Sequence, residues 1–131
     1  MPASIPTDPA ALIQQQLDAY NARDVDAWLA TYAEDAEQYT LHGELLARGH
    51  AQLRARIQVR FAEAELHARL LSRTVMPAGA LAVVVDFEEV TRSFPQGPGT
   101  VEMLCIYEVA AGRIRKASFV MGEPRLDGTR A

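Results

Sequence analysis

The sequence has few of the features that mark secreted, membrane-spanning or cysteine-based metal proteins. Its 131 residues include one cysteine, Cys105, which excludes an internal disulfide and a cysteine-based metal site. The longest apolar run, from Ala78 to Val85, is far too short to cross a membrane. No basic segment followed by an apolar stretch opens the chain, so no signal peptide is expected. We therefore expect a cytoplasmic protein with no membrane partner.

The sequence also lacks any block of like charge. Thirteen Lys and Arg are scattered among seventeen Asp and Glu, and the net charge is −4. Because nucleic-acid binders usually present a basic face, we expect no nucleic-acid partner. Hydrophobic residues make up 49% and charged residues 23%, which is typical of a globular chain long enough to bury a core. The pattern predicts an N-terminal extension over residues 1–8, one domain over 9–122 and a C-terminal tail over 123–131.

The first predicted helix follows Asp8 and Pro9, which suit the cap and first turn of a helix. At about 100° per residue, one apolar stripe results; it contains Leu12, Ile13, Leu17 and Tyr20. Gln16 lies in the middle of this stripe, whereas its neighbours Gln14 and Gln15 project to the other side. We therefore expect Gln16 to face inward, either to satisfy a buried backbone group or to contact a ligand.

Two more helices are predicted in the first half. Asp24 can cap the second, which would run to about Asp35 and bury Trp28 and Tyr32. Gly49 precedes the third, over residues 50–64, whose apolar seam is Leu53, Ile57 and Phe61. Its arginines, Arg54, Arg56 and Arg60, are interpreted as a solvated flank.

The second half has the character of β-strands separated by turn residues. Strands are predicted over 66–75, 80–94, 100–109 and 113–121, after two short strands over 37–42 and 44–48. Short connections favour an antiparallel meander, because a parallel crossover needs a dozen residues or more. The expected fold is α+β: a curved antiparallel sheet forms a cone, and the three helices of the N-terminal half close an apolar pocket.

Several short segments strengthen this expectation. They are Tyr20–Asp24, Trp28–Ala36, Arg48–Leu53, Phe87-Glu-Glu and Val120-Met-Gly122. In order and spacing the chain resembles the nuclear transport factor 2-like superfamily, which includes SnoaL-like and ketosteroid-isomerase-like proteins, over roughly residues 9–122. These segments hold mainly caps and core positions, so they are specific for the cone fold and say little about chemistry.

The resemblance also assigns three positions on which ketosteroid isomerases depend. Those enzymes use an aspartate base and an oxyanion hole of a tyrosine and a protonated aspartic acid. By position, the tyrosine corresponds to Gln16, the base to Thr40 and the acid to Cys105. Threonine is no general base near neutral pH, and a thiol is a weak donor. We therefore expect no ketosteroid isomerisation by that mechanism, although the fold also hosts dehydratases, epoxide hydrolases and polyketide cyclases.

Strand alternation, taken with the helical stripes, predicts which side chains line the pocket. The predicted lining is Gln16, Tyr20, Trp28, Thr40, Phe61, Val85, Phe87, Glu89, Met103, Cys105, Tyr107, Phe119 and Met121. This set is largely apolar with a few polar atoms, so the expected ligand is a small apolar or aromatic molecule.

No residue is assigned as catalytic, but three titratable candidates are noted. Glu89 would be an acid–base group if it were buried in the pocket, and would pair with an arginine or water if it lay at the rim. His50 and His42 are the other two, at a helix start and a strand end. With His67 they show no metal-ligand spacing, so neither a metal nor a cofactor is expected. Cys105 is interpreted as a buried, inert thiol.

The convex side of the sheet is expected to be apolar as well. Strand alternation places Leu104 and Ile106 on it, with Ala82 and Val84 on the neighbouring strand. An apolar outer face must be covered, and no spare helix remains, so a homodimer through this face is expected. Three functions stay open: a binding protein for small hydrophobic molecules, a cofactor-independent isomerase, dehydratase or cyclase using Glu89, and a protein-binding dimerisation module.

Overall fold

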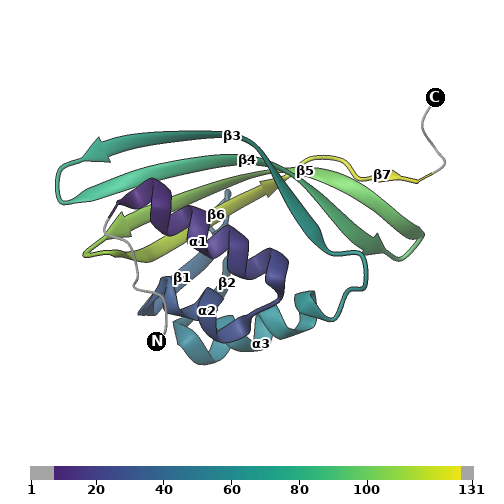
Figure 1. The fold of residues 1–131 in the computed structure, drawn as a ribbon, viewed down its shortest axis with the longest axis horizontal. Coiled ribbons are helices and arrows are strands. Elements are labelled where there is room, and N and C mark those ends of the chain that lie inside the picture. The colour runs from purple at the N-terminus through teal and green to yellow at the C-terminus, as the bar shows by residue number, and fades with distance from the viewer. Residues whose placement is uncertain (1–7, 128–131) are drawn as a thin grey trace.

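The structure is a computed structural model that describes residues 8–127 (Figure 1). Within this range the α+β class is confirmed: three helices pack against one curved, seven-stranded sheet. Residues 1–7 of the expected extension and 128–131 of the expected tail lie outside the described residues. Part of the tail is ordered, because Arg125–Leu126 forms strand β7 beside Gly99 and Thr100.

Helix α1 spans Pro9–Ala22, as its cap and stripe predict. The Asp8 carboxylate accepts a hydrogen bond from the backbone N–H of Ala11 at 2.9 Å. At the other end Arg23 adopts a left-handed conformation with φ of 56°, and its N–H contacts the last carbonyls of the helix. Both ends of α1 are thus satisfied locally. Burial of the stripe with Leu12 and Ile13 turns Gln16 inward.

Helix α2, Val25–Ala30, is shorter than its apolar pattern indicates, and α3 spans Gly49–Phe61. Asp24 caps α2 by accepting a hydrogen bond from Ala27 N at 3.0 Å. The chain leaves the helix at Thr31, and strand β1, Tyr32–Thr40, begins immediately. Tyr32 therefore belongs to the sheet, although helical spacing from Trp28 places it on the same face.

The sheet is built mainly from long antiparallel hairpins. The remaining strands are β2 Leu45–Arg48, β3 His67–Ala78, β4 Leu81–Phe94, β5 Gly97–Ala110 and β6 Arg113–Met121. The order is β2-β1-β6-β5-β4-β3, with β7 on β5. The predicted meander from β3 to β6 is antiparallel, whereas β1 runs parallel to β6. This parallel pair joins the N-terminal half to the far end of the chain, and local turn signals do not indicate it.

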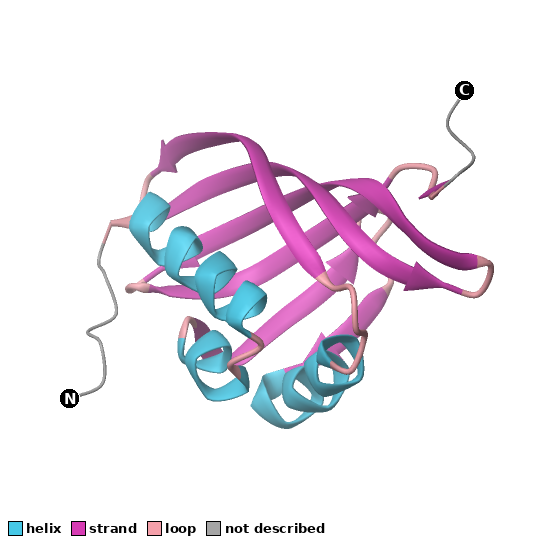
Figure 2. Ribbon diagram, turned by 45° about the vertical axis from the view of Figure 1, so that its right-hand side comes forward, coloured by secondary structure: helices cyan, strands magenta, loops and turns pink. Residues whose placement is uncertain are grey.

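All three helices lie on the concave side of the sheet (Figures 1 and 2). Among the described residues, the larger core cluster contains 17 side chains and joins α1, α2 and α3 to β1, β2, β4, β5 and β6. Tyr32, Leu12, Ile13, Leu53 and Ile114 are among its largest members. No helix of the described chain covers the convex side. The hollow between helices and sheet is where a pocket can form.

Candidate ligand pocket

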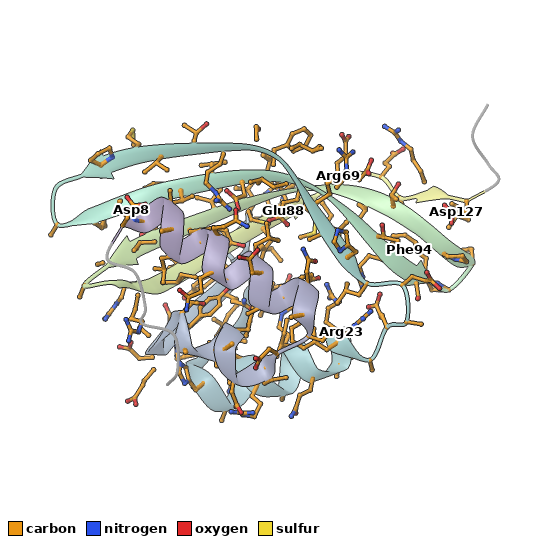
Figure 3. All side chains as sticks on the ribbon, in the orientation of Figure 1. Asp8, Arg23, Arg69, Glu88, Phe94 and Asp127 are labelled. Atoms are coloured by element: carbon orange, nitrogen blue, oxygen red, sulfur yellow. The ribbon has the colours of Figure 1, made fainter. Side chains whose placement is uncertain are left out.

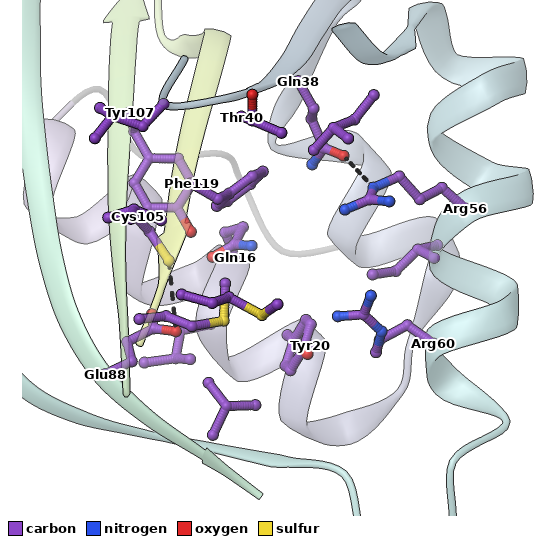
Figure 4. Close-up of a pocket in the computed structure, with 18 of the residues that line it drawn as sticks. Gln16, Tyr20, Gln38, Thr40, Arg56, Arg60, Glu88, Cys105, Tyr107 and Phe119 are labelled. Atoms are coloured by element: carbon purple, nitrogen blue, oxygen red, sulfur yellow. Dashed lines mark hydrogen bonds between the residues drawn. The ribbon is translucent and has the colours of Figure 1, made fainter. Parts of the chain in front are cut away.

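A cavity of about 440 Å³ lies between the helices and the concave face of the sheet (Figure 4). Its lining comprises Gln16, Leu17, Tyr20, Trp28, Tyr32, Gln38, Thr40, Leu41, His42, Leu46, Arg56, Ile57, Arg60, Glu88, Val90, Met103, Cys105, Tyr107, Phe119, Val120 and Met121. Leu41, His42 and Met121 are exposed and mark the opening, whereas Gln16, Trp28 and Glu88 are buried. A volume of this size is within the range of small-molecule sites.

The sheet wall of the pocket carries one buried acid, Glu88 on β4. Its side chain is only 5% exposed, and the Cys105 thiol on β5 donates a weak hydrogen bond to its Oε1 at 3.8 Å. Burial, and secondarily the negative charge of Asp86, raise the pKa of Glu88 to about 7. The Cys105 contact and Arg73 oppose this shift without cancelling it. Glu88 can therefore both give and take a proton near neutral pH.

Asp86 lies one inward position away on β4 and is completely buried. Arg73 on β3 holds it in a two-pronged ion pair, with Nε to Oδ1 at 2.7 Å and Nη2 to Oδ2 at 2.8 Å. The same guanidinium donates from Nη1 to Gln14 Oε1 at 3.0 Å, so it also ties α1 to the sheet. The charge of Asp86 thus lies next to Glu88 on the inward face of β4 and helps to raise the pKa of Glu88.

The helix wall carries two buried polar atoms that have no partner in the described chain, Gln16 Oε1 and Trp28 Nε1. Gln16 is 5% exposed and Trp28 is 2% exposed, and both line the cavity. Buried polar atoms normally find hydrogen-bond partners, and leaving one unpaired costs about 1–3 kcal/mol. One atom accepts and the other donates, so both are available to a polar ligand.

The three positions that correspond to the ketosteroid isomerase machinery meet in this cavity. Gln16, Thr40 and Cys105 all line it (Figure 4). Thr40 Oγ1 is engaged in the turn between β1 and β2, where it accepts from Glu44 N at 3.1 Å. Burial raises the pKa of the Cys105 thiol well above its usual value, and the charge of Glu88 adds to this effect. Neither residue supplies the base or the acid of that reaction, and Glu88 occupies a position that the resemblance did not indicate.

Helix α3 contributes a basic wall. Arg56 and Arg60 are half-buried, and both line the cavity, with their guanidinium groups directed from the helix toward the strands (Figure 4). The interpretation of these two as solvated is therefore wrong. Each lies three residues after a seam position, Leu53 or Ile57, and so shares the inward side of the helix. Arg54 alone behaves as expected: it is exposed and pairs with Asp26 at 2.7 Å.

Two tyrosines connect the walls. Burial raises the pKa of Tyr20 to about 12, and the nearby Arg60 partly opposes this shift. Tyr32 is fully buried, which raises its pKa further, and its hydroxyl accepts from Gln38 Nε2 at 3.3 Å. Gln38 Oε1 accepts in turn from Arg56 Nε at 3.2 Å. Both phenols stay protonated near neutral pH and are hydrogen-bond donors rather than bases.

The predicted phase of β4 is wrong by one residue. Val85, Phe87 and Glu89 lie on the convex face, and the inward positions are Val84, Asp86, Glu88 and Val90. The register explains this, because Glu88 faces Met103 and Asp86 faces Cys105 across the β4–β5 pair. Glu89 pairs with Arg69 on the outside at 3.2 Å. Figure 3 shows Arg69 projecting outward and Glu88 lying on the helix side of the sheet.

The other predicted pocket residues fall into two groups. Tyr20, Trp28, Met103, Tyr107, Phe119 and Met121 line the cavity. Phe61 does not line it; its ring packs edge-on against Tyr20 with 5.6 Å between centroids, because α3 ends there. Contact of any of these side chains with a ligand remains a prediction.

The histidines have separate environments. His42 is exposed at the pocket opening. His50 contacts the backbone carbonyl of Tyr32 through Nε2 at 2.9 Å and does not line the cavity. His50 and Glu89, two of the titratable candidates, are joined by no hydrogen bond or ion pair within residues 8–127, so they do not act as a pair. Residues 8–127 contain no group of three or more His, Cys, Asp or Glu that could hold a metal ion.

The β4–β5 register also changes which residues are assigned to the convex face. Val84, assigned to it from the sequence, is fully buried on the inner side, and Ala82 shares that phase. Leu104 and Ile106 do lie outside, facing Phe87 and Val85 across the β4–β5 pair. The outer apolar set is therefore Val83, Val85, Phe87, Leu104 and Ile106.

Among the helices of residues 8–127, none is long and apolar enough to cross a membrane.

Comparison with known proteins agrees with this geometry. The family model described as SnoaL-like domain matches residues 13–117. A candidate polyketide cyclase from Sinorhizobium meliloti is 26% identical with a TM-score of 0.61, over 83% of this chain and 93% of that one. A candidate ketosteroid isomerase from Kribbella flavida is 16% identical with a TM-score of 0.67, over 92% and 82%. An uncharacterised cystatin-fold protein from Novosphingobium aromaticivorans is 18% identical with a TM-score of 0.67, over 83% and 94%. No curated protein has a matching sequence.

Proposed function

Because this chain belongs to the family of SnoaL-like domains, we propose that it binds a small, largely apolar molecule in the cavity between its helices and its sheet. The observation that carries this proposal is the cavity itself, with the two unpaired polar atoms Gln16 Oε1 and Trp28 Nε1 in its wall. An apolar body would contact Met103 and Phe119. A donor and an acceptor on the ligand would satisfy the two orphaned atoms.

A thermal-shift screen of small aromatic and alicyclic compounds tests this proposal. A ligand that binds only the folded state raises its stability in a concentration-dependent way, by about 2.7 kcal/mol at a hundredfold excess over Kd. Met103→Trp fills the cavity and should abolish the shift. Glu102→Trp puts the same bulk on the exposed neighbouring position and should keep it. Equal shifts in the two variants would place binding outside the cavity and contradict the proposal.

Glu88 favours a second candidate function, cofactor-independent proton transfer on such a molecule. A buried carboxyl with a pKa near 7 is suited to take a proton from an acidic C–H and to return it elsewhere. The candidate polyketide cyclase and ketosteroid isomerase among the similar structures are named for reactions on small organic molecules. Glu88 would take the acid–base role that the sequence assigned to Glu89.

A generic proton-abstraction probe tests this second function. With 5-nitrobenzisoxazole, a carboxylate base removes the ring C–H proton, the N–O bond breaks and a cyanophenolate is released, so no co-reactant is needed. The rate should rise with pH around a midpoint near 7, since only ionised Glu88 is a base. Glu88→Gln should abolish it, and Glu89→Gln should leave it unchanged. An unchanged rate in Glu88→Gln would exclude Glu88 as the base.

We also propose that the chain forms a homodimer through its convex sheet face. The outer apolar set defined above has no helix over it within residues 8–127, and Leu104 is 39% exposed. A contiguous apolar surface of this kind favours burial against a partner, and a second copy offers the same surface with two-fold symmetry.

A further inference from the structure

The basic wall of the pocket holds more positive than negative charge. Next to this wall, two arginines, Arg60 and Arg92, share one carboxylate, that of Glu63. Arg92 donates to Glu63 from Nε at 2.9 Å and from Nη2 at 2.8 Å, and Arg60 Nε approaches it at 3.3 Å. The backbone N–H of Ser93 donates to it as well, at 3.0 Å. Glu63 is thus fully used by Arg60, Arg92 and the backbone.

Arg56 has no carboxylate partner among residues 8–127. Its Nε donates to the neutral amide oxygen of Gln38 at 3.2 Å, and the described part of the chain offers this guanidinium no other hydrogen bond or ion pair. Burial, and secondarily the charge of Arg60, lower the pKa of Arg56. A half-buried cation with a like charge beside it is costly unless an anion compensates it.

Solvation alone is a poor explanation for this arrangement. Arg54, two residues earlier on the same helix, shows what a solvated arginine does here. It is exposed and pairs with Asp26 at 2.7 Å. Arg56 instead points into the cavity, and its free Nη groups face the strand wall (Figure 4). A guanidinium fork aimed into a largely apolar cavity matches the two oxygens of a carboxylate.

We infer that the ligand of this pocket is an amphipathic carboxylate, whose anionic oxygens Arg56 binds with Arg60 beside it, and whose apolar body extends toward Met103 and Phe119. This inference rests on the proposed binding function and specifies its ligand class. Glu88 lies on the opposite wall, on the strand side of the cavity (Figure 4). The bound molecule would therefore have its charged end at α3 and its carbon skeleton next to the acid–base group.

Calorimetric titration with naphthalene-2-carboxylate and naphthalene-2-carboxamide tests the inference, because the two probes share a shape and differ in charge. The carboxylate should bind at least about tenfold more tightly than the amide, since charge-assisted hydrogen bonds are roughly twice as strong as neutral ones. Arg56→Gln should weaken the carboxylate about tenfold and the amide less than twofold. Arg54→Gln, the matched control on the same helix, should change neither.

Arg56→Lys keeps the charge and loses the fork, so it should bind the carboxylate with intermediate affinity and remain folded if the glutamine variant does not. Equal affinity of the two probes for the unmodified protein would overturn the carboxylate inference and leave the apolar pocket standing. An equal loss for both probes in Arg56→Gln would do the same. Failure of both probes to bind would overturn the pocket proposal and, with it, this one.

Discussion

Glu88 and Glu89 are adjacent in sequence and lie on opposite faces of the sheet. Glu88 is buried in the cavity next to the Cys105 thiol, whereas Glu89 pairs with Arg69 on the convex side. The buried acid, whose pKa is raised, thus has a neighbouring carboxylate outside the cavity for comparison.

Replacing Glu88 by Gln should change the pH dependence of stability. Its pKa is raised from 4.5 to about 7 on folding, so the folded state takes up a proton between these values that the unfolded chain does not bind. This contribution is fully present below 4.5 and is lost as pH rises through 7, at a cost of roughly 3 kcal/mol. Urea unfolding at pH 5 and pH 8 should show Glu88→Gln gaining stability relative to the native chain only at pH 8. Identical profiles for Glu88→Gln and the native chain would refute the shifted pKa of Glu88.

Glu63 should have the opposite pH dependence. Burial raises its pKa, but the hydrogen bonds from Arg92 and Ser93 and the charges of Arg92 and Arg60 outweigh this and hold it below its usual value. The stability that it contributes is present above its unfolded pKa and is lost as pH falls through the lowered value. Glu63→Gln should cost about 1–3 kcal/mol at pH 7 and much less at pH 3, as measured by urea unfolding. A pH-independent cost would show that the ion pairs contribute little.

The ion pair of Arg73 and Asp86 should be strongly coupled. Asp86→Leu leaves a mostly buried guanidinium without its partner and should cost about 3–5 kcal/mol. The double variant Arg73→Met with Asp86→Leu should recover most of this loss, because two apolar side chains replace two charges. A double-mutant cycle of unfolding free energies measures the coupling, and additive losses would show that there is none.

Gly99 should be required for strand β7. A Cβ at this position would lie 2.3 Å from the carbonyl oxygen of Arg125, so β7 would have to move. Gly99→Ala should therefore cost about 1–3 kcal/mol and release Arg125–Leu126 from β5, seen as faster amide exchange at Leu126. Gly122→Ala is the control, since its Cβ would meet nothing closer than 3.5 Å. Unchanged exchange in Gly99→Ala would contradict this account.

Leu104→Lys should convert the proposed dimer to a monomer. The substitution places a charge within the outer apolar set, and burying an unpaired charge is costly. Sedimentation equilibrium should show a dimer for the native chain and a monomer for the variant, with the cavity ligand still bound. Val59→Lys, at an exposed position on α3, is the control and should leave the mass of the assembly unchanged. A native chain that sediments as a monomer would exclude this dimer.

The starts of the helices, the meander and the inward rotation of Gln16 are predictable from the sequence, because caps, turn residues and helical periods are local signals. The end of α2 is not, since the second helix is predicted to run to about Asp35 and ends at Ala30. The phase of β4 was not predictable in the same way. Val83, Val84 and Val85 are all apolar, so alternation does not show which of them faces inward. The β4–β5 turn decides which β4 residues face inward. Phe94 pairs with Gly97, and this register places Glu88 opposite the inward-facing Met103. Residues 95–99 are rich in proline and glycine, so the pattern predicts a loop up to residue 100, whereas β5 already begins at Gly97.

The basic wall was missed for a different physical reason. Arginine in a helix next to an apolar seam usually extends its charged end to water, so Arg56 and Arg60 were interpreted as solvated. Their direction depends on the parallel pairing of β1 with β6, which brings Gln38 and the pocket wall opposite α3. The i+3 spacing from Leu53 and Ile57 places both arginines beside the inward side of α3, but the long-range contact with Gln38 has no local signal.

Cys105 provides a direct way to follow the cavity. It is the single cysteine of the chain, it is 3% exposed, and it lines the same space as Glu88. An alkylating reagent such as N-ethylmaleimide can reach it only by entering that space, and its raised pKa leaves little reactive thiolate at neutral pH. The rate at which mass spectrometry detects one added label therefore measures how often the cavity is open and empty. Labelling of Cys105 therefore reports ligand occupancy of the cavity without an engineered tag or a known reaction.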